Sequence, residues 1–220
     1  MGILISLEAS PKKVFATAMD WPGWSRSGKT EELALEALVA YGSRYAVVAR
    51  EAGVAFKPPA AGDLDLVERV DGGGGTAFGV PSVVTELDRR PVTKSEAHRL
   101  ARLVEAAWAV FDRVVAAAPA ELRKGPRGGG RDRDKMVAHV VESDVGYARQ
   151  LGLPIPYADP MDAAAAQAQR AATLEVLRQP SDGSPLAGRS WTLRYAAHRI
   201  AWHALDHAWE IEDRSDPSAE

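Results

Sequence analysis

Apolar and polar residues alternate in the first third of the chain, which is the pattern of half-buried β-strands. Residues 3–7 carry apolar side chains at every second position, and residues 14–19 form a second apolar run after a turn at Ser10-Pro11. Residues 64–70 alternate in the same way, after a stretch of helical spacing over residues 30–53 that Thr30 would cap. This order predicts a small β-β-α-β unit.

After residue 90 the spacing of the apolar residues becomes helical. Thr93-Lys-Ser-Glu96 has the sequence of a capping box, and Asp159-Pro160 that of an N-cap followed by proline at the first helical position. Helices joined by connections of about 10–14 residues favour an antiparallel four-helix bundle. The expected helices cover residues 93–118, 132–151, 159–179 and 191–214.

We therefore predict an α+β chain with two domains, the first over residues 1–90 and the bundle over residues 91–220. Hydrophobic residues make up 46% and charged residues 26% of the chain, which is ordinary globular composition. The formal net charge of −3 argues against strong nucleic-acid binding. No apolar run approaches the ~20 residues of a membrane span, so we expect a cytoplasmic protein.

Histidines provide the candidate chemistry. His203-Ala-Leu-Asp-His207 places two imidazoles about 40° apart around a helix and ~6 Å apart along it, so both can approach one ion. His139 lies among valines in another predicted helix, where a buried imidazole needs a partner or stays neutral. A bundle that brings His139 beside the pair would create a site with three nitrogen ligands. His98 and His198 fit this site poorly, and we interpret them as surface or packing residues.

The chain contains no cysteine, so a metal site would use histidine, aspartate or glutamate. Three neutral imidazoles suit a borderline divalent ion such as zinc, nickel or iron and leave coordination positions open to water. Such a donor set is typical of a catalytic metal site. The alternative is that these histidines have only a packing role.

Two stretches carry a resemblance to a known family. Met136-Val-Ala-His139 with the following Val-Val-Glu142, and His203-Ala-Leu-Asp-His207 with the following Ala-Trp-Glu-Ile211, resemble the DinB family of four-helix metalloproteins over residues 93–214. That family is related to thiol-dependent transferases and maleylpyruvate isomerases. The resemblance implies that His139, His203 and His207 bind one divalent metal. It also implies open positions for water or a low-molecular-weight thiol, such as mycothiol or bacillithiol, beside a small-molecule substrate.

One stretch departs from the family pattern. Ala208-Trp209-Glu210 follows the last histidine where the family usually has Gly-Gln, which leaves the neighbours of the metal ligands and the reaction open. Glu142 and Asp206 are candidates to orient a ligand, and Glu142 also to transfer a proton. The alternative for both is a solvated or ion-paired carboxylate, and Asp206 is expected to point away from the site.

Residues 23–30, Gly-Trp-Ser-Arg-Ser-Gly-Lys-Thr, match the Walker A pattern between a predicted strand and helix, so Lys29 is a candidate nucleotide-binding residue. Against this, the chain lacks the alternating βαβ units of a parallel sheet. Asp20-Trp-Pro-Gly23, Ser25, Gly28, Thr30 and the following Glu-Glu-Leu also resemble the HicB-like domain of antitoxins, over residues 3–55. That resemblance implies a β-β-α-β arrangement in which Gly28 serves a turn and Thr30 a helix cap.

Three functions follow from these patterns. The first is a divalent-metal-binding protein that acts as a metal-dependent hydrolase or a thiol-dependent transferase. The second is a non-catalytic interaction module whose HicB-like part docks a partner or a second copy of the chain. The third is nucleotide binding through Lys29. A cluster of basic residues between the first two bundle helices is either a solvated loop or an anion-contacting lip beside the metal-bearing helix; it comprises Arg123, Lys124, Arg127, Arg131, Arg133 and Lys135.

Overall fold

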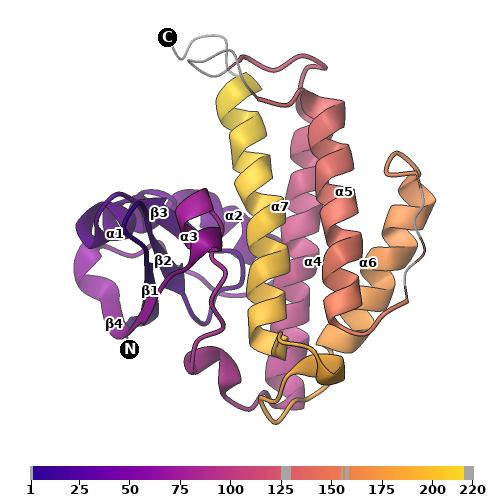
Figure 1. Ribbon diagram of the computed structural model, residues 1–220. Coiled ribbons are helices and arrows are strands. Elements are labelled where there is room, and N and C mark those ends of the chain that lie inside the picture. Colours follow the sequence, from indigo (N-terminus) through magenta and orange to yellow (C-terminus); the bar gives the residue numbers. More distant parts are fainter. Residues whose placement is uncertain (1, 125–129, 155, 157–158, 216–220) are drawn as a thin grey trace.

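Four strands form a mixed sheet at the N-terminal end of the chain. The computed structural model describes residues 2–124, 130–154, 156 and 159–215. The strands are β1 (Ile3–Ala9), β2 (Val14–Ala18), β3 (Ser25–Gly28) and β4 (Leu64–Asp71). In the sheet order β3-β2-β1-β4, β2 is antiparallel to both its neighbours and β4 is parallel to β1 (Figure 1). The predicted α+β class is confirmed.

The strand β3 was not predicted, and it occupies the segment that matches the Walker A pattern. Residues 25–28 pair with β2 as an extended edge strand, so they do not form the loop that surrounds a phosphate. A Cβ atom at Gly28 would lie 2.4 Å from the backbone nitrogen of Ala34, and glycine therefore permits the close approach of α1 (Glu31–Ala40). Thr30 caps this helix as predicted, accepting a hydrogen bond from the Leu33 amide.

The predicted single helix over residues 30–53 is wrong. The helix breaks at Tyr41, and α2 (Gly42–Glu51) follows, so the observed order is β-β-β-α-α-β. The ring of Tyr41 packs against Trp209 with centroids 5.1 Å apart, and a Cβ at Gly42 would lie 3.2 Å from Pro59. These contacts come from distant parts of the chain, which is why local spacing did not reveal the break.

Four long helices make up the second part of the chain, as predicted (Figure 1). They close into a bundle in which α4 and α5 each contact both α6 and α7. The end of α7 lies beside the start of α5, because a Cβ at Gly130, just before α5, would meet Arg214 near the end of α7. A β-bridge between Val92 and Ser181 joins the start of α4 to the end of α6. The helices are α4 (Lys94–Ala117), α5 (Arg133–Gln150), α6 (Ala163–Leu177) and α7 (Leu193–Ser215).

The helix directions refine the predicted antiparallel bundle. Helices α4 and α7 start side by side, since Arg194 of α7 bonds Glu96 of α4 at 2.5 Å, and they run parallel. Helices α5 and α6 run the other way, and the long connection over residues 151–162 brings the chain back to the start of α6. Antiparallel packing therefore holds between α5 and α7 and between α4 and α6. This arrangement needs one long crossover connection.

Two predicted helix caps are different in the structure. Helix α6 is capped by Asp162, whose carboxylate accepts from the amides of the first turn, and not by Asp159. At the start of α4, Thr93 accepts from the Glu96 amide as expected, but the Glu96 carboxylate pairs with Arg194 rather than returning to the cap. The ion pair between Glu96 and Arg194 therefore takes the place of the hydrogen bond that a capping box would form between the Glu96 side chain and the backbone of Thr93.

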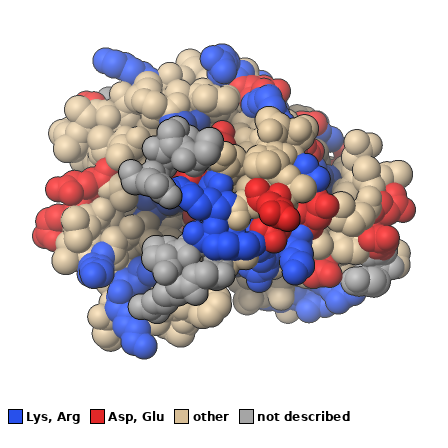
Figure 2. All heavy atoms as spheres, turned by 90° about the horizontal axis from the view of Figure 1, so that it is seen from above, with Lys and Arg blue, Asp and Glu red and all other residues tan. Residues whose placement is uncertain are grey.

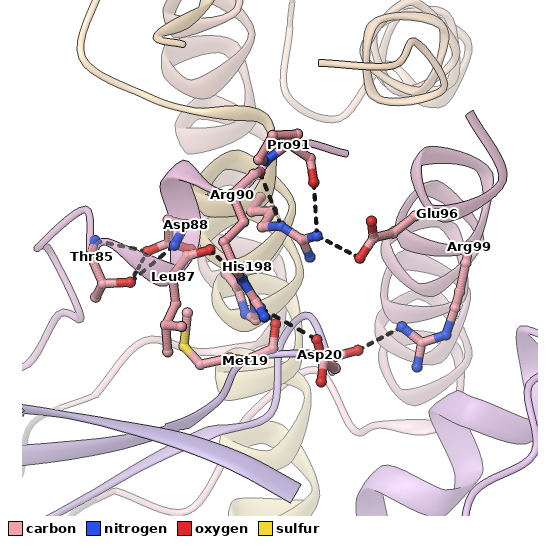
Figure 3. A network of polar contacts seen from close by, with 11 residues as sticks. Met19, Asp20, Thr85, Leu87, Asp88, Arg90, Pro91, Glu96, Arg99 and His198 are labelled. Atoms are coloured by element: carbon pink, nitrogen blue, oxygen red, sulfur yellow. Dashed lines mark hydrogen bonds and ion pairs between the residues drawn. The ribbon is translucent and has the colours of Figure 1, made fainter. Parts of the chain in front are cut away.

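The sheet and the bundle share one hydrophobic core, which runs from Ile5 to Ile211. The turn before β3 packs directly on α7: Gly23, at φ 89°, would place a Cβ 2.7 Å from Leu205. His198 of α7 reaches the Met19 carbonyl oxygen at 3.0 Å, and Arg99 of α4 donates to the Asp20 carbonyl at 2.6 Å (Figure 3). These contacts place the sheet against the side of α7 that faces away from α5.

The connection between the two parts is also fixed by buried polar groups. It contains the short helix α3 (Gly74–Phe78), where the sequence predicted only a turn. The buried carboxylate of Glu8 in β1 accepts from the Thr76 hydroxyl and from the amides of Ser82 and Val83. Asp88 accepts from the amide and hydroxyl of Thr85, both at 2.9 Å (Figure 3). The predicted boundary at Arg90-Pro91 thus lies in a tightly held segment.

Across the described residues, every helix is too short or too polar to cross a bilayer.

Replacement of Gly28 by alanine is expected to destabilise the protein by at least ~2 kcal/mol, because the new methyl group would overlap the backbone of α1. The matched control is Gly146→Ala, at an exposed helical position where nothing lies within 4 Å of the added Cβ. It should raise stability by ~0.5–1 kcal/mol. Urea denaturation compares the two; equal effects would contradict the close approach of β3 and α1.

The buried carboxyl group of Asp144 is expected to make the stability of the protein depend on pH. Burial raises the pKa of its carboxyl to about 7, although Trp108 donates to it at 3.0 Å and Arg170 lies nearby. At pH 5 to 7 the folded protein therefore holds a proton that the unfolded chain releases, so raising the pH favours unfolding. Asp144→Asn removes this cost, and its stability relative to the unchanged protein should rise by about 3 kcal/mol between pH 5 and pH 8. A pH-independent difference in urea denaturation would contradict this.

Candidate metal centre

Three histidines from two helices meet inside the bundle. His139 of α5 and the pair His203 and His207 of α7 each offer a ring nitrogen, and these atoms all lie within 4.8 Å of one another. The Nε2 atoms of His139 and His203 are 3.2 Å apart, and the three ring centroids are separated by 4.6–5.0 Å. The predicted convergence of the three imidazoles is confirmed; that they bind a metal stays a prediction.

The antiparallel packing of α5 and α7 produces this convergence. His203 and His207 are four residues apart and therefore share one face of α7. His139 lies in the second turn of α5, between the buried residues Met136 and Val140 that anchor this helix in the core. Because α5 starts where α7 ends, the second turn of α5 lies opposite the part of α7 that carries His203 and His207.

Burial keeps two of these imidazoles neutral. His203 is 6% exposed, and His139 is half-buried. Burial is the main cause that lowers the pKa of His139 to about 4 and that of His203 to about 2, and the charge of His207 adds to both effects. Neutral imidazoles are the form that binds a metal ion.

Glu210 fixes the orientation of His207. Its carboxylate lies 3.1 Å from Nδ1 of His207 and is itself held by Arg214 at 2.8 Å. The pKa of Glu210 is lowered, mainly through the bond to His207, so the carboxylate is charged and accepts the Nδ1 proton. Nε2 is then the nitrogen of His207 that remains for a metal ion. In the sequence, Glu210 stood out only as a departure from the family pattern. Its position three residues after His207 was the indication that it could reach the ring.

The donor set fits a divalent metal ion. Two ligands bound at 2.0–2.1 Å with a tetrahedral angle lie ~3.3 Å apart, which is close to the Nε2–Nε2 distance of 3.2 Å between His139 and His203. All three donors are imidazole nitrogens, and the carboxylate beside them bonds an outward nitrogen, as is usual around metal-binding histidines. Nδ1 of His203 is buried without a hydrogen-bond partner in the described part of the chain, so this ligand lacks such support.

The other candidate residues lie away from the three histidines. Glu142 is exposed to solvent, and Asp206 points away as predicted, bonding Arg26 at 2.8 Å. His98 is exposed, and His198 is buried in the contact with the sheet, which agrees with surface and packing roles. Lys29 is exposed beside the edge strand β3.

The basic cluster surrounds the end of the bundle where α5 begins. Figure 2 looks onto this end and shows lysine and arginine side chains gathered beside acidic ones. Lys124 pairs with Asp132 and Arg133 with Asp134, whereas Arg131 is exposed and contributes to the low pKa of His139. Arg127 lies outside the described residues. Two of the described members of the cluster, Lys124 and Arg133, are thus held in surface ion pairs.

Aromatic side chains border the histidines on the other side. The Tyr147 ring lies 5.6 Å from that of His203 and 5.3 Å from that of Trp191. Arg199 stacks on Tyr147 with Cζ 5.0 Å from the ring centroid. An apolar wall with one cation thus adjoins the nitrogen ligands.

Comparisons of the chain with protein-family models, with curated proteins and with solved structures gave no match.

Glu210→Gln is expected to weaken metal binding 10–100-fold, because the charged acceptor of the His207 Nδ1 proton is lost. Glu142→Gln is the matched control, since Glu142 is also a glutamate near a histidine ligand in sequence but is exposed. It should leave the affinity unchanged. Competition with a chromophoric chelator measures both variants, and equal affinities would show that Glu210 has no role in the site.

Proposed function

We propose that this chain is a DinB-like cytoplasmic metalloprotein in which His139, His203 and His207 hold one zinc, nickel or iron ion. The single observation that carries the proposal is the meeting of three imidazole nitrogens from α5 and α7 within 4.8 Å of one another. We further propose a small-molecule substrate and a reaction of the metal-dependent hydrolase or thiol-dependent transferase type. The sequence resemblance over residues 93–214 supports this reaction class.

A bound divalent ion would supply Lewis-acid activation of water or of a thiol. The chain's own residues prepare the site for that chemistry. His139 and His203 stay uncharged because they are buried, so near neutral pH each ring keeps one nitrogen with a free electron pair. Glu210 keeps the proton of His207 on Nδ1. Tyr147 and Trp191 form an apolar border that limits the access of water from one side.

The alternative is a non-catalytic interaction module, and one observation favours it. Strand β4 is an edge of the sheet, and Val67 on it is 44% exposed. Phe78 of the following short helix is 86% exposed. The HicB-like part could dock a partner or a second copy of the chain through these residues. Nucleotide binding through Lys29 is not supported, because the Walker A residues form an edge strand.

Elemental analysis after reconstitution with zinc, nickel or ferrous iron tests the proposal. About one metal ion per chain is expected, since three convergent imidazoles form one site. The double variant His203→Ala/His207→Ala should contain none, while His98→Ala, which removes an exposed histidine, should retain it. Circular dichroism checks that the variants fold. Metal-free protein after reconstitution would refute the metal site.

Assays with low-molecular-weight thiols separate the enzyme from the interaction module. Metal-dependent turnover with mycothiol or bacillithiol and an electrophilic acceptor is expected for the transferase. Loss of turnover in His203→Ala, with the fold retained, would attribute it to the site. Metal binding without turnover across several thiols and ester substrates would favour the interaction module.

A further inference from the structure

A small cavity lies between the sheet and α7. Its volume is about 30 Å³, and its walls come from β1, β2, β3, the connecting segment and α7. A cavity needs roughly 10–15 Å³ to hold one water molecule, so this one has room for water and for little else. Cavities that stay empty in proteins have apolar walls, and the chemistry of the walls therefore decides whether the cavity is filled.

The walls of this cavity carry buried polar atoms that lack partners. In the part of the chain that the structure describes, twelve buried side-chain atoms have no hydrogen-bond partner, and five of them belong to residues that line this cavity. Proteins satisfy nearly all such groups, so their concentration at one place indicates that a molecule in the cavity bonds them. The five atoms are Oγ of Ser6, Oδ1 of Asp88, Nδ1 of His198, Nη1 of Arg199 and Nε1 of Trp202.

Two of these atoms are acceptors. Asp88 uses Oδ2 for the amide and the hydroxyl of Thr85, which leaves the carboxylate oxygen Oδ1 (Figure 3). Nε2 of His198 lies 3.0 Å from the Met19 carbonyl oxygen, and since a carbonyl oxygen cannot donate, the ring proton is on Nε2. Burial lowers the pKa of His198, so the ring is neutral and Nδ1 keeps a free electron pair.

Two other atoms can only donate. Nη1 of Arg199 and Nε1 of Trp202 carry hydrogens and accept no hydrogen bond, and the Arg199 side chain also bonds Tyr147. The hydroxyl group of Ser6 can donate or accept. A bound cation would meet the charge of Arg199, and a bound anion would meet Oδ1 of Asp88. The molecule that satisfies these walls therefore has to be small and to donate and accept at once.

We propose that the cavity is a binding site for an ordered water molecule that joins the sheet to the bundle. One water molecule can donate to Asp88 and His198 and accept from Arg199 and Trp202, which uses all four of its hydrogen bonds. Ser6 of β1 supplies a further partner. The water thus links the connecting segment and the sheet to α7 by hydrogen bonds, beside the apolar packing of the same contact.

The indole N–H of Trp202 tests the proposal by NMR of the ¹⁵N-labelled full-length protein. A rotating-frame Overhauser experiment should give a cross-peak between this hydrogen and the water resonance, because a buried water stays long enough to transfer magnetisation. Trp202→Phe assigns the signal. The matched control is Trp24, which is equally buried but donates to the Leu38 carbonyl oxygen at 3.0 Å, so no cross-peak is expected there. A Trp202 signal that also lacks the cross-peak overturns the proposal.

Ser6→Ala separates a bound water from the exchangeable hydroxyl group of Ser6. The Trp202 cross-peak should remain in this variant, since the other four partners are unchanged, and its loss would assign the signal to the hydroxyl and refute the water site. A high-resolution crystal structure should show oxygen density within roughly 2.5–3.2 Å of at least three of the five atoms. A dry cavity, or walls in which Asp88 and His198 bond Arg199 and Trp202 directly, would contradict the proposal.

Discussion

The packing of α5 against α7 in opposite directions is the constraint on which the candidate site depends. It brings a histidine near the start of one helix to two histidines around the middle of the other, with the Nε2 atoms of His139 and His203 only 3.2 Å apart. Imidazoles buried so close together cannot all carry a proton, because burial and mutual repulsion both disfavour the charged form. The same arrangement therefore gathers the ligands and keeps them in the form that binds a cation.

Helix α7 links this site to the rest of the molecule. One side of it carries His203 and His207 toward α5, and the other side carries His198 and Trp202 toward the sheet. The sheet is held on that second side by the close approach of Gly23 and by bonds from α4 and α7 to the turn after β2. Any change in how the sheet sits on α7 would act on the same helix that holds two of the three ligands. The N-terminal part is in this sense a support for the bundle as well as a candidate docking surface.

The charges around the site are arranged unevenly. Glu210 and Arg214 form a bonded pair behind His207, where the negative charge meets the outward nitrogen of the ring. On the opposite side, Arg199 is stacked between two aromatic rings and has no acidic partner in the ranges described. A negative group is thus used where it orients a ligand, and the positive group on the opposite side is held by aromatic rings.

The sequence by itself determined the elements that depend on local chemistry. Alternation predicted β1 and β4, and an apolar run after a turn predicted β2. Helical spacing predicted the four long helices, and the four-residue spacing of His203 and His207 fixed their common face. The break at Tyr41, the pairing of β3 and the partner of Glu96 depended on contacts with distant residues, which local spacing does not contain. Only the tertiary structure decided that His139 meets the pair and that Glu210, not Glu142, is the neighbouring carboxylate. The physical reason is that helix spacing fixes which face a residue occupies, whereas the direction and depth of packing fix what that face meets.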